Sequence, residues 1–213
     1  MKKAVIISLI LLCGFYSDAQ VWMGSTIRIG APRTYRRGPG REPVKYNPSV
    51  DFSIGYGFPN LDKNLLSDFY GYYRSNASQT GPVSGSIDYQ YSKYNSIGIL
   101  ATYGKASVLY NSYGTASSFT GNIESWSVML NLINYMPGTD KVNPYLRTAI
   151  GINSATINYL YNDGTHAFGS NSPSDLAYQV SLGAKFGLSK KSSFFIEAGY
   201  GKYILQGGLS FKF

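Results

Sequence analysis

The sequence predicts an all-β protein, an eight-stranded antiparallel transmembrane β-barrel, from its charge content, its strand periodicity and its alternating loop lengths. Charged residues make up only 14% of the chain, whereas soluble domains usually contain roughly 25%. The hydrophobic share of 44% is nevertheless ordinary, and the mean hydropathy is −0.13. A membrane β-barrel accommodates both values, because only every second residue of each strand contacts lipid.

Residues 1–19 have the pattern of a cleaved signal peptide. Lys2 and Lys3 precede an apolar run that ends at Leu12, and the small residue Ala19 predicts cleavage before Gln20.

Cys13, the only cysteine, lies within this segment. We therefore expect no disulfide, thiol nucleophile or cysteine metal ligand in the mature chain. Lipidation of Cys13 is an alternative, although Leu12 precedes it where a small residue is expected.

We expect residues 20–47 to form an extended or disordered periplasmic tail, because this segment is rich in proline and glycine. Six basic residues and one acid, Glu42, give the tail a charge of +5, out of +8 for the whole chain. The basic residues are Arg28, Arg33, Arg36, Arg37, Arg41 and Lys45. They predict contact with an anionic envelope polymer or with lipid head groups, and a merely solvated linker is the alternative. Nucleic acid is not expected, since a secreted protein seldom meets it.

Residues 48–213 form the predicted barrel, because apolar and polar residues alternate there with a period of two. In the first strand, for example, the apolar Val50 and Phe52 flank Asp51, and the alternation is blurred only near Leu100. The eight predicted strands span residues 50–58, 87–92, 97–110, 125–132, 146–153, 178–187, 194–200 and 205–213.

The connections between these strands alternate in length. The long polar ones are Pro59–Pro82, Asn111–Gly121 and Tyr161–Ser174. The short ones are Lys93–Asn95, Pro137–Asn143 and Ser189–Ser192. Short periplasmic turns and longer external loops are typical of outer-membrane barrels. With a periplasmic N-terminus, every long loop falls outside, and Gly201–Ile204 form a short fourth external turn.

The last strand carries Leu209, Phe211 and Phe213 on one face, which we expect to point toward lipid. These residues are the predicted C-terminal signal for the outer-membrane insertion machinery. Pairing of the last strand with the first would satisfy both free edges, as a lipid environment requires.

Several short motifs occur in order along the barrel region. They are Gly55-Tyr56-Gly57-Phe58 ahead of Pro59 and Asn60, Gly81-Pro82, Asn134-Tyr135, Asn143-Pro144-Tyr145 and Ser210-Phe211-Lys212-Phe213. In these motifs the region from Pro48 to Phe213 resembles the small outer-membrane β-barrel domain family of Bacteroidota. Most members of that family have no assigned activity, so the resemblance implies a fold and a location.

Four charged residues fall on the predicted inward face at a similar depth: Asp88, Arg147, Lys185 and Glu197. Unpaired charges inside a barrel would be costly, so two acids and two bases predict an ion-pair network. Since side chains fill an eight-stranded barrel, we expect this network to occlude the lumen. A gate or a proton path is the alternative.

His166 is the only histidine, and Asp163, Ser170 and Ser172 lie near it in one predicted external loop. A nucleophilic site needs a base, a nucleophile and an orienting group within reach of one another. These four residues alone are weak evidence for one, and no metal-ligand or phosphate-loop spacing occurs, so we expect neither catalysis nor a cofactor.

We therefore expect a monomeric, non-enzymatic outer-membrane barrel with a structural or surface-interaction role, in contact with outer-membrane lipid. A narrow pore or an accessory component of a secretion or transport machine is the alternative. A lipid-modifying enzyme at the rim is a weaker one.

Overall fold

The computed structural model describes residues 46–213 except 114–117, 140, 162–164 and 172–173. The predicted signal peptide and all six basic residues of the tail lie outside the described residues. The strands are β1 (Ser49–Phe58), β2 (Tyr72–Gln90), β3 (Asn95–Ser112), β4 (Ser118–Tyr135), β5 (Val142–Tyr161), β6 (His166–Asn171), β7 (Ser174–Gly187), β8 (Ser192–Tyr200) and β9 (Leu205–Lys212).

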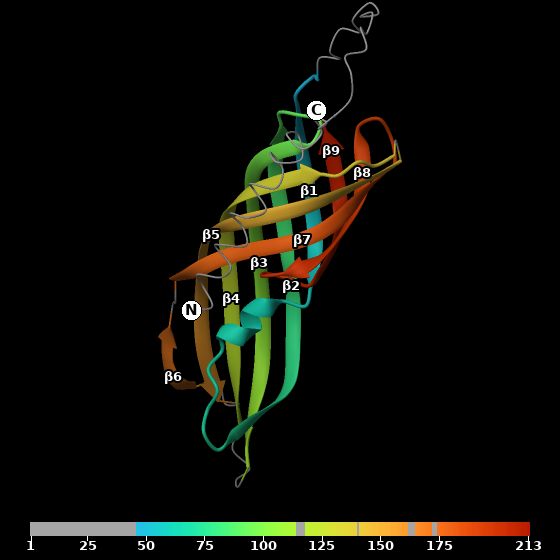
Figure 1. Ribbon diagram of the computed structural model, residues 1–213. Helices are drawn as coiled ribbons and strands as arrows, with labels where there is room; N and C mark the ends of the chain where they lie inside the picture. The colour runs from blue at the N-terminus through green and yellow to red at the C-terminus, as the bar shows by residue number, and fades with distance from the viewer. Residues whose placement is uncertain (1–45, 114–117, 140, 162–164, 172–173) are drawn as a thin grey trace, which may run out of the picture. The chain divides into compact units, whose positions relative to one another are not determined.

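Eight of these strands form a closed antiparallel ring in the order β1, β2, β3, β4, β5, β7, β8, β9 (Figure 1). The ring closes because β1 pairs with both β2 and β9, so that Ile54 lies opposite Gly85 on one side and Leu209 on the other. β6 pairs only with β5 and lies outside the ring. The predicted fold class, an eight-stranded antiparallel barrel, is confirmed.

Strands β2 to β5 are much longer than the others. They contain 18 to 20 residues each, whereas β1, β8 and β9 contain 8 to 10. About 9–11 residues suffice to cross a bilayer at a tilt. The long strands therefore continue beyond the ring as an open sheet, which we call the extension, with β6 along its β5 edge (Figure 1).

The extension corrects the predicted loops. Tyr72–Gln90 is one strand, so residues 72–82 of the predicted loop Pro59–Pro82 belong to β2. Gly81 and Pro82 suggested a loop, but they lie at a register shift between Thr80 and Val83, where the strand is irregular without ending. The other two predicted long loops are also shorter than expected, because β3 runs to Ser112, β4 begins at Ser118, and β6 occupies part of 161–174.

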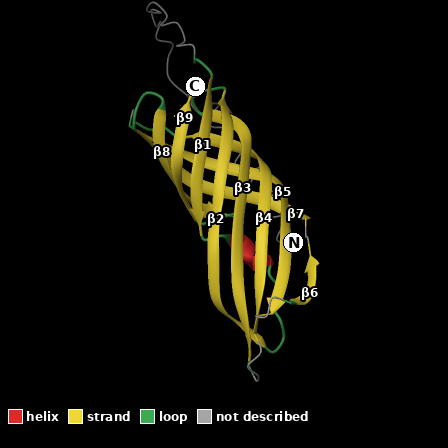
Figure 2. Cartoon of the chain, turned by 180° about the vertical axis from the view of Figure 1, so that it is seen from behind, coloured by secondary structure: helices red, strands yellow, loops and turns green. Residues whose placement is uncertain are grey.

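The remaining connection on this side contains a short 3-10 helix, η1 (Leu61–Leu65), capped by the Asn60 side chain. It contacts β3 and β4 on the inner face of the sheet, at the level where the ring ends (Figure 2). In the described part of the chain no helix is long and apolar enough to span a membrane. Gly201 to Ile204 form the predicted short fourth turn, between β8 and β9.

Alternation is continuous along β3, including the point where the sequence pattern is blurred. Leu100 points inward and is fully buried, where it packs with Met129, Ala149 and Ala177. The lumen therefore contains one apolar layer. It interrupts the alternation of apolar and polar residues in the sequence, but the strand continues through it.

Candidate functional site

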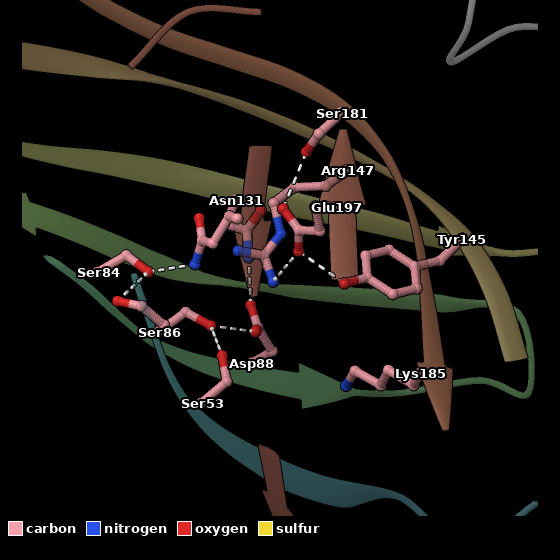
Figure 3. Close-up of polar contacts among 12 residues, drawn as sticks. Ser53, Ser84, Ser86, Asp88, Asn131, Tyr145, Arg147, Ser181, Lys185 and Glu197 are labelled. Atoms are coloured by element: carbon pink, nitrogen blue, oxygen red, sulfur yellow. Dashed lines mark hydrogen bonds and ion pairs between the residues drawn. The ribbon is translucent and has the colours of Figure 1, made fainter. Parts of the chain in front are cut away.

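An ion pair lies in the middle of the lumen, between Arg147 of β5 and Glu197 of β8. Arg147 Nη2 is 3.3 Å from Glu197 Oε1, and both side chains are at most 2% exposed. Tyr145 donates a hydrogen bond of 2.6 Å to the same carboxylate, and Ser181 donates one of 3.0 Å to its other oxygen (Figure 3). Tyr203 also donates a bond of 3.0 Å to that second oxygen. Such hydrogen bonds offset the cost of removing a carboxylate from water.

Asp88, on β2, lies near this pair but is held by neutral groups. Asn131 Nδ2 donates to its carboxylate at 2.6 Å and Ser86 at 2.7 Å, and Ser86 is in turn 2.6 Å from the Ser53 hydroxyl (Figure 3). Among the described residues, its direct hydrogen-bond partners are thus amide and hydroxyl groups.

Lys185 pairs with a residue that the sequence reasoning missed. Its Nζ is 2.8 Å from Asp51 Oδ2 on β1 and donates to the Tyr135 hydroxyl at 3.0 Å. Asp51 lies near the start of β1, and its alternation with the outward Val50 and Phe52 places it on the inner face. The four predicted lumen charges therefore lie in three separate contact groups.

A further buried ion pair closes the lumen at the end where η1 lies. Lys202, from the β8–β9 turn, places its Nζ 2.5 Å from Asp62 of η1 and 2.9 Å from Asn153 Oδ1. Ser125 also donates to the Asp62 carboxylate. Burial lowers the pKa of Lys202, although Asp62 opposes this shift. No strand periodicity indicates this pair, because the acid and the base both come from connections between strands.

Beyond this pair, the inner face of the extension is apolar. Its buried residues are Ala106, Val108, Tyr110, Phe119, Ile123, Ala155, Ile157 and Tyr159, and Leu66 from the connection after η1 belongs to the same core. Phe69, in the connection after η1, packs edge-on against the rings of Tyr110, Phe119 and Tyr159 at centroid distances of 5.0 to 5.3 Å. The Tyr110 hydroxyl donates to the Ser67 carbonyl at 2.8 Å, and Ser67 N–H donates to the Tyr159 hydroxyl at 3.1 Å. The connection is thus fixed to the sheet by a hydrophobic core and by hydrogen bonds.

Three tyrosines are exposed at the far end of the extension. Tyr70 is 105% exposed, Tyr113 76% and Tyr73 43%. The rings of Tyr73 and Tyr113 are 5.1 Å apart, and Tyr113 N–H donates to the carbonyl of Gly71, next to Tyr70. We call Tyr70, Tyr73 and Tyr113 the tip tyrosines.

The outer face of the ring is apolar between two aromatic bands. One band, near the short turns, contains the exposed side chains of Tyr89, Tyr91, Phe186, Phe194, Phe211 and Phe213. The other, where the ring ends, contains Tyr56, Phe58, Tyr103, Trp126 and Tyr200. Aliphatic residues fill the space between them, among them Ile54, Ile87, Ile99, Val128, Leu130, Leu182, Ile196 and Leu209. An apolar belt between two aromatic girdles on a closed antiparallel ring is the surface of a barrel embedded in an outer membrane.

The chain is an outer-membrane β-barrel. The predicted location is therefore confirmed, and the short turns mark the periplasmic end. Leu209, Phe211 and Phe213 point outward from β9, on the surface that faces lipid. Their role as an assembly signal stays a prediction.

No family model and no curated protein matches the chain. Among solved structures, it is similar to the outer membrane protein OprG of Pseudomonas aeruginosa, at 13% identity and a TM-score of 0.45, over 78% of this chain and 94% of that one. It is also similar to the N-terminal β-barrel domain of OprF of the same organism, at 14% identity and a TM-score of 0.44, over 78% and 97%. A third similarity is to Ail, the attachment invasion locus protein of Yersinia pestis, at 11% identity and a TM-score of 0.38, over 78% and 97%.

Only two of the four residues considered for an enzyme site at the rim lie within the described part of the chain. The backbone of His166 and Ser170 lies in β6, and Asp163 and Ser172 lie outside the described residues. Within the described ranges, no group of three or more histidine, cysteine, aspartate or glutamate side chains is arranged to hold a metal ion.

Proposed function

We propose that this protein is a non-enzymatic surface-interaction protein, which uses the extension to present the tip tyrosines to a partner outside the cell. The observation on which the proposal rests is that exposed aromatic side chains lie at the end of a sheet with a packed apolar core. Tyrosine and other aromatic residues dominate binding hot spots, because they contribute a large contact area at a low cost in conformational entropy.

The support is the apolar inner face of the extension. A loop tip with no core beneath it would lose much of its binding energy to ordering on contact. Here the core continues to the base of the tip, since Tyr72 packs on the Phe119 ring at 5.0 Å while its neighbour Tyr73 points outward. The tip tyrosines therefore extend from a sheet that is already folded.

The contents of the lumen favour this role over that of a pore. Two buried ion pairs, Arg147–Glu197 and Lys202–Asp62, lie across the path of a solute, and each is tied to further side chains by hydrogen bonds. The motifs that resemble the Bacteroidota barrels support the same kind of protein, a small barrel of that family without a catalytic assignment.

Site-specific photo-crosslinking in intact cells would test the proposal. A photoreactive amino acid at Tyr113 should give a crosslinked product of one defined size, and the same amino acid at the lipid-facing Ile99 should not. Replacing Tyr70 and Tyr73 by serine should reduce the Tyr113 product, because the partner would lose most of its aromatic contacts.

Two results would overturn the proposal. One is the absence of any product from the tip in cells that display the protein at normal levels. The other is rapid uptake of a disaccharide by vesicles that contain the purified barrel, which would show an open lumen and favour the pore.

A further inference from the structure

A cavity of about 580 Å³ opens into the lumen at the periplasmic end. Its walls come from β1, β2, β4, β5, β7, β8, β9 and all three short turns. The volume is within the range of small-molecule sites, which measure roughly 300–1,000 Å³. We call this cavity the vestibule.

Lysine dominates the charge of the vestibule. Its described lining residues include one carboxylate, Asp51, and five lysines: Lys93, Lys185, Lys190, Lys191 and Lys212. Asp51 is already paired with Lys185. Among the described residues, the other four lysines have no carboxylate within ion-pair distance. Four lysines without a carboxylate partner in the described part of the chain therefore border one cavity, where their positive charges repel one another and attract anions.

The Lys212 side chain contacts a residue of the inner face of the ring. Phe211 and Phe213, its neighbours in the sequence, point outward, whereas Lys212 Nζ lies 3.4 Å from Oε1 of the buried Gln90. A lipid head group outside the ring would be separated from Lys212 by the wall of the barrel. Within the described part of the chain, the vestibule faces the periplasmic side, from which water-soluble compounds can enter it.

The residue type indicates the anion. Among the residues that the structure describes, the lining contains lysine and no arginine. Arginine suits planar, bidentate carboxylates, whereas lysine acts as a point charge and is a common phosphate ligand. Hydroxyl groups of Ser189, Ser192, Ser193 and Ser210 also line the cavity and can donate hydrogen bonds to phosphate oxygens.

We infer that the vestibule binds a soluble periplasmic compound that carries two or more phosphate groups. This site lies at the opposite end of the barrel from the tip tyrosines and does not depend on the extracellular role. Binding would neutralise the lysines and close the periplasmic mouth of the lumen.

The test uses the full mature chain, purified in a neutral detergent, with tripolyphosphate as the probe. Residues 20–213 contain no cysteine, so Ser193→Cys introduces a single labelling site inside the vestibule. An environment-sensitive fluorophore at this position should report saturable binding of tripolyphosphate with a stoichiometry of one. The triple variant Lys190→Gln, Lys191→Gln, Lys212→Gln should bind about tenfold more weakly or worse, because three charge-assisted contacts are lost.

The basic tail provides a control with the same change in charge. Arg33→Gln, Arg36→Gln and Arg37→Gln together also remove three positive charges, and this variant should keep its affinity within about threefold, because salt screens the general effect of net charge. All three lysines are exposed, so their replacement should leave the fold intact, which an unheated gel would show as unchanged mobility. The single variant Lys190→Gln gives a milder test if the triple variant does not assemble.

Equal affinity in the wild type and the lysine variant would overturn the inference, as would equal losses in the lysine and tail variants. A fluorescence response to phosphatidylglycerol vesicles but not to tripolyphosphate would overturn it too, because it would assign the lysines to lipid head groups.

Discussion

Strands β2 to β5 belong to two regions, the ring and the extension, whose inner and outer faces are opposite in polarity. Along β3, Ile99 points outward and Thr102 inward within the ring, whereas Ser107 points outward and Val108 inward within the extension. The change falls at one level in neighbouring strands. Tyr103 lies opposite Trp126 in the outer aromatic band, and two residues farther along Lys105 lies opposite Glu124.

The polarity pattern of a strand has two causes, the geometry of its backbone and the medium around it, and the ring and the extension differ only in the second. The alternation of side chains is a property of the strand backbone and does not change along β3. The choice of which face is apolar depends on the medium, because lipid surrounds the ring and water surrounds the extension. The inversion of polarity thus marks the outer boundary of the membrane, between Tyr103 and Lys105.

The largest expected effect concerns closure, which only the ring has. Replacing Phe211 and Phe213 by aspartate should prevent most of the protein from assembling, because the strand that closes the ring would present two charges to lipid and to the insertion machinery. The control variant Ser78→Asp, Thr80→Asp adds two charges to β2 in the extension and should assemble normally. Heat-modifiable mobility of outer-membrane fractions measures both, and equal yields would contradict the lipid-facing role of β9.

The second prediction concerns the buried pair in the ring. Arg147→Met should destabilise the barrel by about 3–5 kcal/mol, because Glu197 would be left buried and without its cation. Adding Glu197→Gln should cost less than the sum of the two single changes. Urea unfolding in lipid would measure this double-mutant cycle. Simple additivity would show that the two side chains do not interact.

A third prediction compares the outer faces of the two regions by placing an arginine on each. Leu130→Arg puts a charge in the middle of the apolar belt and should cost about 2–4 kcal/mol in lipid. Thr120→Arg, on the outer face of the same strand in the extension, should change the free energy of unfolding by less than about 0.5 kcal/mol. Similar losses would place the membrane boundary elsewhere on β4.

The fourth prediction tests packing. Ile123→Val leaves a small cavity in the core of the extension and should cost about 0.5–1.5 kcal/mol. The same change at Ile99, on the lipid face, should cost only a few tenths of a kcal/mol, since lipid chains adapt to the lost methyl group. Limited proteolysis would follow local opening of the extension, and urea unfolding would follow the ring.

The smallest effect lies at the boundary itself. The Tyr103 hydroxyl donates a hydrogen bond to Glu124, which holds the pKa of the Glu124 carboxyl below its usual value, as does Lys105 Nζ at 3.2 Å. A depressed folded pKa means that this stabilisation is present at neutral pH and is lost as the pH falls through that pKa. In an NMR titration, added salt should move the pKa of Glu124 toward its usual value, because water and ions reach this level. A pKa insensitive to salt would place Glu124 within the lipid belt.

The sequence by itself determined the ring. A period of two is the geometry of a strand, and lipid requires the outward residues to be apolar. Residues such as Val50, Asp51 and Phe52 therefore predicted the strands of the ring and the direction in which their side chains point. Arg147 and Glu197 were predicted to face the lumen in the same way, because each alternates with apolar residues that point outward.

Only the tertiary structure decided the extension and the partners of the lumen charges. The inward face of β3 changes from polar to apolar beyond Tyr103, and a local pattern cannot show that the medium outside the strand has changed. Asp62 and Lys202 come from connections 140 residues apart, and η1 is what brings them together. Their pairing, like that of Lys185 with Asp51, depends on how the ring closes in space, because contacts across a lumen join residues that no sequence period relates.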